Sequence, residues 1–124
     1  MSQQLTTLVI GASENPERYS NKAIRLLKQK NHPVIALGLR KGQVAGVEFE
    51  TDIKAIVNNV VDTVTLYINP SLQRAYYEAI IELKPRRVIF NPGTENIEFE
   101  ELLATSQIES EEACTLVLLN TGQY

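Results

Sequence analysis

The stretch Leu5-Thr6-Thr7-Leu8-Val9-Ile10-Gly11-Ala12-Ser13 decides the fold of this 124-residue chain. Its centre, Leu8 to Ile10, is apolar without alternation and partly β-branched, which indicates a central parallel strand with both faces covered. Gly11 ends this strand, and a helical pattern starts near Ser20. A strand that stops at Gly-Ala-Ser before a helix leaves small residues and backbone N–H groups where an anionic ligand can approach closely. A tight turn without a ligand accounts for the same residues, so both interpretations stay open here.

The loop after this strand departs from the dinucleotide-binding fingerprint. Gly-x-Gly-x-x-Gly requires glycines at the positions of Ser13 and Pro16, and only Gly11 is present. Because Pro16 disfavours a helical Asn15, the loop is expected to run on to about Tyr19. A longer loop with a serine hydroxyl suits a ligand other than plain NAD.

Composition narrows the class of protein. The length predicts a single domain over residues 1–124 with its own core. A net charge of −3 gives no general attraction to nucleic acid or to anionic lipid. Cys114 is the only cysteine, Met1 to Gln4 carry no basic region, and no apolar run could span a bilayer. We therefore expect a cytoplasmic protein that binds neither nucleic acid nor membrane.

Strand and helix patterns alternate along the chain. This alternation predicts an α/β protein with a three-layer, doubly wound fold and a mostly parallel sheet of five or six strands. The expected strands after the first are residues 34–37, 46–50, 64–68, 87–90 and 113–119. The expected helices include residues 21–30, 70–83 after an Asn69 cap, and a later helix capped by Thr94 or Asn96.

Some side chains receive structural assignments from the same patterns. Helical spacing places Tyr76 in the core and directs Tyr77 elsewhere. The charge run Glu109, Glu111 and Glu112 is expected to be a solvated loop. Cys114 would begin the last buried strand as an inert thiol.

Four segments are expected at the carboxyl edge of the sheet, where doubly wound folds bind ligands: Gly11 to Ser13, Gly38 to Lys41, Asn69-Pro70, and Asn91 to Glu95. The second of them lacks the carboxylate that holds the ribose hydroxyls of NAD and carries Arg40 and Lys41 instead. Two cations suit a ribose that bears its own phosphate, as in NADP or coenzyme A. A solvated basic turn between glycines is the alternative.

The chain resembles the CoA-binding domain family, which shares the Rossmann-like fold of the amino-terminal domain of the succinyl-CoA synthetase alpha subunit. The resemblance rests on four short motifs and covers the whole chain: Val9 to Ser13 with the polar loop to Lys22, Leu37 to Lys41 with Gly46, Ile68 to Pro70, and Asn91 to Gly93 with Glu95. One departure is Gly38-Leu39, which stands where the family commonly has Asn-Pro followed by a basic residue.

The resemblance implies a coenzyme A site. In it Gly11, Ala12 and Ser13 would hold the pyrophosphate, and Arg40 or Lys41 would pair with the phosphorylated ribose. The crevice would be lined by Pro70 and by Asn91, Pro92, Gly93 and Glu95.

No catalytic or metal-binding constellation is visible in the sequence. His32 precedes the second strand and so belongs at the edge opposite the expected crevice. Three hypotheses follow. The first is a stand-alone module that binds coenzyme A or an acyl-CoA, the second a small NADP-binding protein or oxidoreductase, and the third a degenerate nucleotide fold used for protein interaction. Small folds of this kind often form homodimers, although no residue pattern here specifies one.

Overall fold

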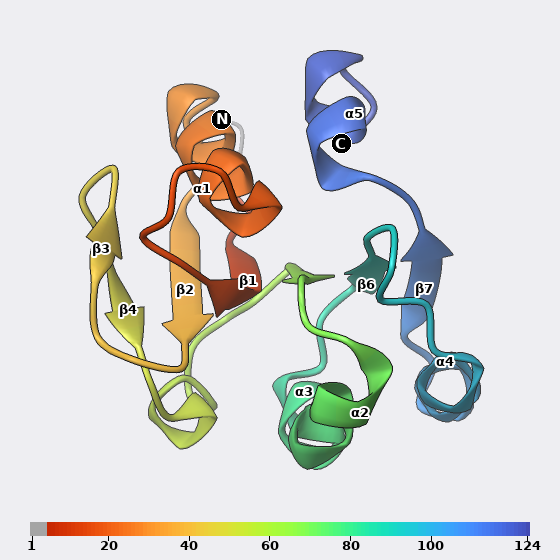
Figure 1. Ribbon diagram of the computed structural model, residues 1–124. Helices are drawn as coiled ribbons and strands as arrows, with labels where there is room; N and C mark the ends of the chain where they lie inside the picture. Colours follow the sequence, from red (N-terminus) through yellow and green to blue (C-terminus); the bar gives the residue numbers. More distant parts are fainter. Residues whose placement is uncertain (1–4) are drawn as a thin grey trace.

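The computed structural model describes residues 5–124, which form a seven-stranded sheet flanked by helices (Figure 1). The strands are β1 (Thr7–Ala12), β2 (Val34–Gly38), β3 (Gln43–Val44), β4 (Val47–Glu50), β5 (Thr63–Leu66), β6 (Arg87–Phe90) and β7 (Glu109–Glu112). The helices are α1 (Tyr19–Gln29), α2 (Pro70–Gln73), α3 (Tyr77–Leu83), α4 (Ile97–Thr105) and α5 (Thr115–Asn120), with 3-10 turns at Ile53–Ala55 and Arg74–Tyr76. None of these helices has the length and apolarity needed to cross a bilayer.

The strand order β3-β4-β2-β1-β5-β6-β7 makes the sheet doubly wound. The chain winds from β1 through β2 to β4 in one direction and from β5 through β6 to β7 in the other, so the direction reverses between β1 and β5. Helices α1 and α5 consequently cover one face of the sheet, and α2, α3 and α4 cover the other (Figure 1). The predicted three-layer, mostly parallel Rossmann-like fold is confirmed.

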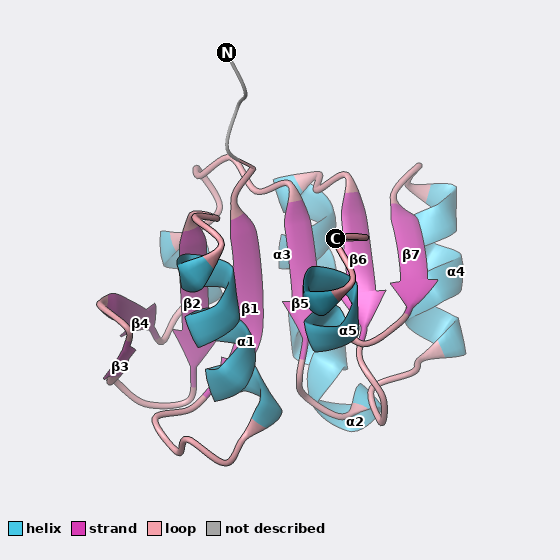
Figure 2. Cartoon of the chain, turned by 90° about the horizontal axis from the view of Figure 1, so that it is seen from above, coloured by secondary structure: helices cyan, strands magenta, loops and turns pink. Residues whose placement is uncertain are grey.

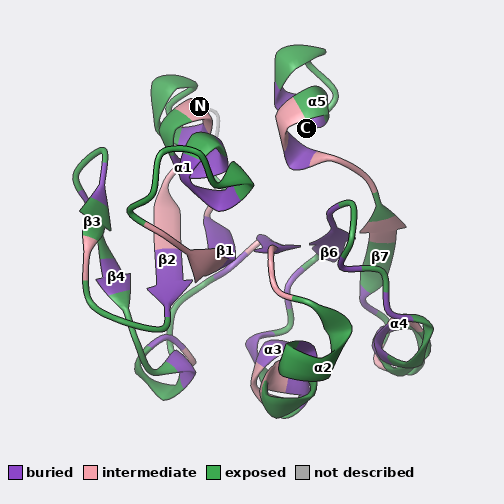
Figure 3. Ribbon diagram, viewed as in Figure 1, coloured by how far each residue is buried: buried purple, intermediate pink, exposed green. Residues whose placement is uncertain are grey.

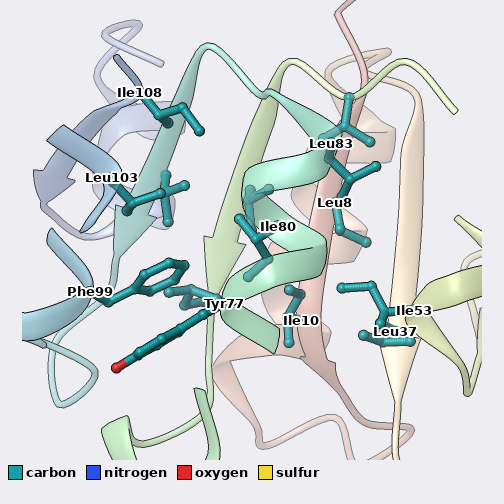
Figure 4. Close-up of a cluster of buried hydrophobic side chains, with 14 of the residues drawn as sticks. Leu8, Ile10, Leu37, Ile53, Tyr77, Ile80, Leu83, Phe99, Leu103 and Ile108 are labelled. Carbon is teal, nitrogen blue, oxygen red and sulfur yellow. The ribbon is translucent and has the colours of Figure 1, made fainter. Parts of the chain in front are cut away.

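Strand β1 lies in the centre of the sheet and contributes to both cores (Figure 3). Leu8 and Ile10 pack in the cluster beneath α3 and α4, together with Ile80 and the residues labelled in Figure 4. Val9 points to the opposite face and packs with residues of α1 such as Ile24. All three β1 residues are at most 1% exposed, which explains why the sequence shows an unbroken apolar run.

The sheet has one strand more than the five or six expected. The additional strand is β3, which pairs antiparallel with β4 through Gln43 and Val44. Ala45 and Gly46 both have positive φ, 52° and 82°, as a tight two-residue hairpin turn requires. A strand of two residues is too short to produce a periodic signal in the sequence.

The expectation for the carboxyl-terminal region is wrong in two respects. The glutamate run expected as a loop is strand β7, which pairs parallel with β6. Because β7 lies at the edge of the sheet, it needs no apolar side chains, and Glu111 forms an ion pair of 3.4 Å with Arg87 of β6. The residues expected as a last strand form α5 instead, which buries Leu118 and Leu119. Cys114 therefore precedes a helix rather than opening a strand.

The assignment of the two tyrosines is reversed. Tyr77 is buried and stacks on Phe99 with 4.2 Å between the ring centroids, whereas Tyr76 is only half-buried. The cause is the 3-10 turn Arg74–Tyr76, which interrupts the expected continuous helix and changes which residues face the sheet. Leu72, which the same helical spacing predicts on the apolar face, is exposed.

Candidate functional site

The carboxyl ends of β1, β2, β5 and β6 lie at one edge of the sheet, and the segments that follow them lie on the same side of the molecule (Figure 2). Register fixes this arrangement, since Ile10 pairs with Leu37 on one side and with Leu66 on the other, and Leu66 pairs with Phe90. The structure thus brings all four predicted segments to one edge.

Gly11 occupies an irregular position in β1, between the paired residues Ile10 and Ala12. Its φ is +100°, and a Cβ there would lie 3.1 Å from the carbonyl carbon and oxygen of Tyr67 and from the Ile68 side chain. Only glycine meets both demands, because it tolerates positive φ and adds no atom at the contact. The chain is thereby able to cross the end of β5 closely before it enters the loop to α1.

Local hydrogen bonds shape the loop between β1 and α1. The Ser13 hydroxyl oxygen accepts from Asn15 N at 3.1 Å, and the buried Asn21 side chain donates to Ser13 O at 2.9 Å. Helix α1 begins at Tyr19, close to the expected start, and no side chain caps its amino terminus. The first N–H groups of α1 are therefore not used by a side-chain cap.

The segment after β2 lies against this loop. Ala12 pairs with Gly38, and a Cβ on Gly38 would lie 3.0 Å from Ala12 O, so a glycine allows the two strand ends to approach. Arg40 and Lys41 follow, both exposed, and neither belongs to an ion pair among residues 5–124. The predicted pyrophosphate segment and the two predicted cations thus lie on adjacent segments.

A side-chain contact joins these two segments. Glu14 extends from the β1–α1 loop, and its Oε2 accepts a hydrogen bond of 3.0 Å from Gln43 N. The Glu14 side chain lies on Gly42, since its Cδ is only 2.7 Å from where a Gly42 Cβ would be. Glu14 and Lys41 also line a cavity of about 560 Å³ that reaches to β4.

Asn69 and Pro70 begin α2 as predicted. The Asn69 side chain accepts from Leu72 N at 3.1 Å, and Pro70 takes the first helical position with its side chain exposed. The buried Gln73 then donates to Ile68 O at 3.0 Å and to Thr94 O at 2.8 Å. Gln73 thereby connects α2 to the loop after β6.

In the β6–α4 loop, Asn91 differs from its neighbours. The Asn91 side chain is buried and donates to Thr65 Oγ1 at 2.7 Å and to Leu66 O at 2.8 Å, while its oxygen accepts from Thr115 N at 2.9 Å. These contacts give it the role of joining β5, β6 and α5.

The rest of this loop faces outward. Pro92, Gly93 and Glu95 are exposed, Gly93 has a φ of +92°, and its N–H donates to Glu95 Oε1 at 2.9 Å. A Cβ on Gly93 would meet nothing within 4 Å, so this part of the loop borders open space. Asn96, and not Thr94, caps α4 by accepting from Phe99 N.

Tyr67 lies beside Gly11 at this edge of the sheet. Burial raises the pKa of Tyr67 to about 12, so its phenol stays protonated at neutral pH and is no general base. Within residues 5–124 no group of three His, Cys, Asp or Glu side chains could hold a metal ion. His32 precedes β2 at the opposite edge, where its ring packs edge-on against Tyr124. The uncapped amino terminus of α1, together with the exposed Arg40 and Lys41 outside the ion pairs of residues 5–124, offers donors for an anionic ligand.

Comparison with known proteins gives the family. The sequence model of the family described as CoA binding domain matches residues 5–120. This chain belongs to the CoA binding domain family. No curated protein matches it.

Solved structures agree with this membership. An uncharacterized protein has 44% sequence identity and a TM-score of 0.90, with 99% of this chain and 100% of that one covered. The protein cell-free ID.343 from Thermus thermophilus has 21% identity and a TM-score of 0.85, covering 98% and 91% of the two chains. A hypothetical protein from Pyrococcus horikoshii OT3 has 22% identity and a TM-score of 0.84, covering 93% and 81%. The last two share the fold.

Three residues that shape this region were not predicted from the sequence. Glu14 and Gln73 act through contacts with residues 29 and 21 positions away, which no local pattern reports. Tyr67 lies inside the predicted strand 64–68 but follows the observed β5, and a tyrosine in an apolar stretch gives no sign of its surroundings. The position of Glu14 directly after Gly11-Ala12-Ser13 is the sequence signal that could have identified it as part of the site.

Proposed function

We propose that this protein is a stand-alone module that binds coenzyme A or an acyl-CoA across the carboxyl edge of its sheet. Gly11, Ala12 and Ser13 hold the pyrophosphate, and Arg40 or Lys41 pairs with the 3′-phosphate on the ribose. Pro70 and the exposed part of the Asn91 to Glu95 loop line the path of the pantetheine.

The observation that carries this proposal is the pairing of Ala12 with Gly38. It aligns the small-residue end of β1 with the segment that bears both cations, and the winding direction of the sheet reverses beside β1. Membership of the CoA binding domain family supports the choice of ligand.

The available donors and space fit such a ligand. A diphosphate accepts hydrogen bonds from backbone N–H groups, and the first turn of α1 has no side-chain cap. Arg40 and Lys41 are exposed and outside the ion pairs of residues 5–124, so a phosphate gains a cation without breaking an existing pair. Gly93, in the loop after β6, borders open space at the same edge of the sheet.

Isothermal titration with CoA, dephospho-CoA, NADPH and NADH tests the proposal. A charge-assisted contact to the 3′-phosphate contributes about 1.5–3 kcal/mol, so dephospho-CoA should bind roughly 10- to 150-fold more weakly than CoA. Arg40→Ala or Lys41→Ala should remove most of that difference. Lys28→Ala is the control, because Lys28 is an equally exposed cation in the last turn of α1, away from this edge.

The other outcomes identify the alternatives. Tight NADPH binding with a preference over NADH, and no CoA binding, would favour an NADP-binding protein that uses the same two cations. Absence of binding by all four nucleotides would leave the third hypothesis, a nucleotide fold used for protein interaction.

A further inference from the structure

The segment after β2 already binds a carboxylate of the protein itself, that of Glu14. Glu14 Oε2 accepts a hydrogen bond of 3.0 Å from Gln43 N, two residues after Lys41. A backbone N–H next to a lysine and an arginine is a typical set of donors for a phosphate. Here a carboxylate from another loop takes the backbone donor.

Glycine at position 42 makes this contact possible. The Glu14 atoms Cδ, Cγ and Oε2 lie 2.7, 2.8 and 3.0 Å from the place of a Gly42 Cβ, so the carboxylate lies directly on the backbone of the segment. Glu14 is exposed, and no other hydrogen bond or ion pair within residues 5–124 holds its carboxylate. Its side chain can therefore leave this position at little cost.

We propose that Glu14 is a specificity-determining residue, which occupies the phosphate-binding segment in the free protein and is displaced by the ribose phosphate of the ligand. The inference rests on the proposed function. A ligand without that phosphate does not displace the Glu14 carboxylate, which keeps its hydrogen bond from Gln43 N. The Glu14 charge thus weakens binding of CoA more than binding of dephospho-CoA.

The test compares CoA with dephospho-CoA in Glu14→Gln, Glu17→Gln and the unaltered protein. Both ligands carry the pyrophosphate, so the ratio of their affinities isolates the effect on the 3′-phosphate. Glu14→Gln should raise this ratio about sixfold through tighter binding of CoA, the effect of one charge about 8 Å away at an effective dielectric constant of about 40. Glu17→Gln removes an exposed carboxylate from the same loop and should leave the ratio unchanged. Thermal unfolding verifies that both variants fold.

The opposite results overturn the inference. An unchanged or lower ratio in Glu14→Gln, with CoA still bound by the unaltered protein, would refute the role of Glu14 and leave the proposed function intact. A ratio that rises because dephospho-CoA binds more weakly, while the affinity for CoA stays unchanged, would also refute this role and show instead that Glu14 accepts hydrogen bonds from ribose hydroxyls. If neither the unaltered protein nor either variant binds CoA, the proposed function and this inference fall together.

Discussion

Replacing Asn91 by alanine should destabilise this protein far more than its loop position suggests. The Asn91 side chain makes three buried hydrogen bonds of 2.7–2.9 Å, to Thr65 Oγ1, Leu66 O and Thr115 N. Alanine makes none of these hydrogen bonds, so β5 and the start of α5 lose the side chain that connects them to the end of β6. The change therefore affects three elements at once.

The magnitude follows from the groups left behind. Thr65 Oγ1 keeps a second partner, Thr115 Oγ1 at 2.8 Å, so the loss falls on the Leu66 carbonyl and the Thr115 N–H. Each buried backbone group that loses its partner costs about 1–3 kcal/mol, so the free energy of unfolding should fall by about 2–6 kcal/mol. A small domain with about 5–15 kcal/mol in total loses a large share of its stability by this change.

Urea denaturation followed by circular dichroism measures the effect. Asn69→Ala is the matched control, because Asn69 also bonds backbone through its side chain but is an exposed helix cap, worth about 1 kcal/mol. An Asn91→Ala loss no larger than that of Asn69→Ala, at an unchanged m-value, would refute the argument from burial.

Three further predictions concern stability. Tyr77→Phe removes a hydroxyl bonded to Asn96 and Glu98 and should cost about 1–2 kcal/mol in urea denaturation, whereas Tyr76→Phe should cost less than about 0.5 kcal/mol. Burial, together with Glu112, raises the pKa of Glu100, so Glu100→Gln should raise the urea midpoint at pH 7. Burial by itself raises the pKa of Asp62, but hydrogen bonds from Arg86 and Thr63 lower it below the ordinary value. Asp62→Asn should therefore lower the urea midpoint at pH 7.

The two carboxyl predictions have opposite signs, and both effects depend on pH. A raised pKa in the folded state means that Glu100 favours folding below its unfolded pKa of about 4.5 and that this contribution is lost as the pH rises through the folded value. The lowered pKa of Asp62 means that its contribution is present above about pH 3.8 and is lost as the pH falls. The Glu100→Gln gain should therefore vanish once the pH is below about 4.5, whereas the Asp62→Asn loss should fade only as the pH falls further below about 3.8. Gains or losses that stay constant from pH 3 to pH 7 would contradict both assignments.

Elements with strong local signals were predictable from the sequence. The apolar run in β1 and the asparagine caps at Asn69 and Asn96 depend on residues that are neighbours in the chain. The expectation that Gly11 ends the strand is wrong by one residue, because β1 continues past an irregularity at Gly11 to Ala12. The same signals placed four segments at one edge of the sheet, because parallel strands present their carboxyl ends together.

Features that depend on distant parts of the chain were not predictable. The apolar residues 116–119 suit either a buried strand or a short helix over the sheet, and only the presence of β7 beside β6 decides between them. Tyr77 takes the core position because a 3-10 turn shifts the helix by a fraction of a turn. The contact of Glu14 with Gln43 spans 29 residues and has no periodic signature.

The glutamates of β7 bear on how copies of this protein can meet. An outermost strand offers its outward-facing backbone groups to any other strand, and two copies could in principle continue one sheet through β7. Such a junction would bring Glu109, Glu111 and Glu112 of each copy against their counterparts, with Arg87 able to offset only part of the charge. The repulsion between these carboxylates therefore disfavours a junction through β7.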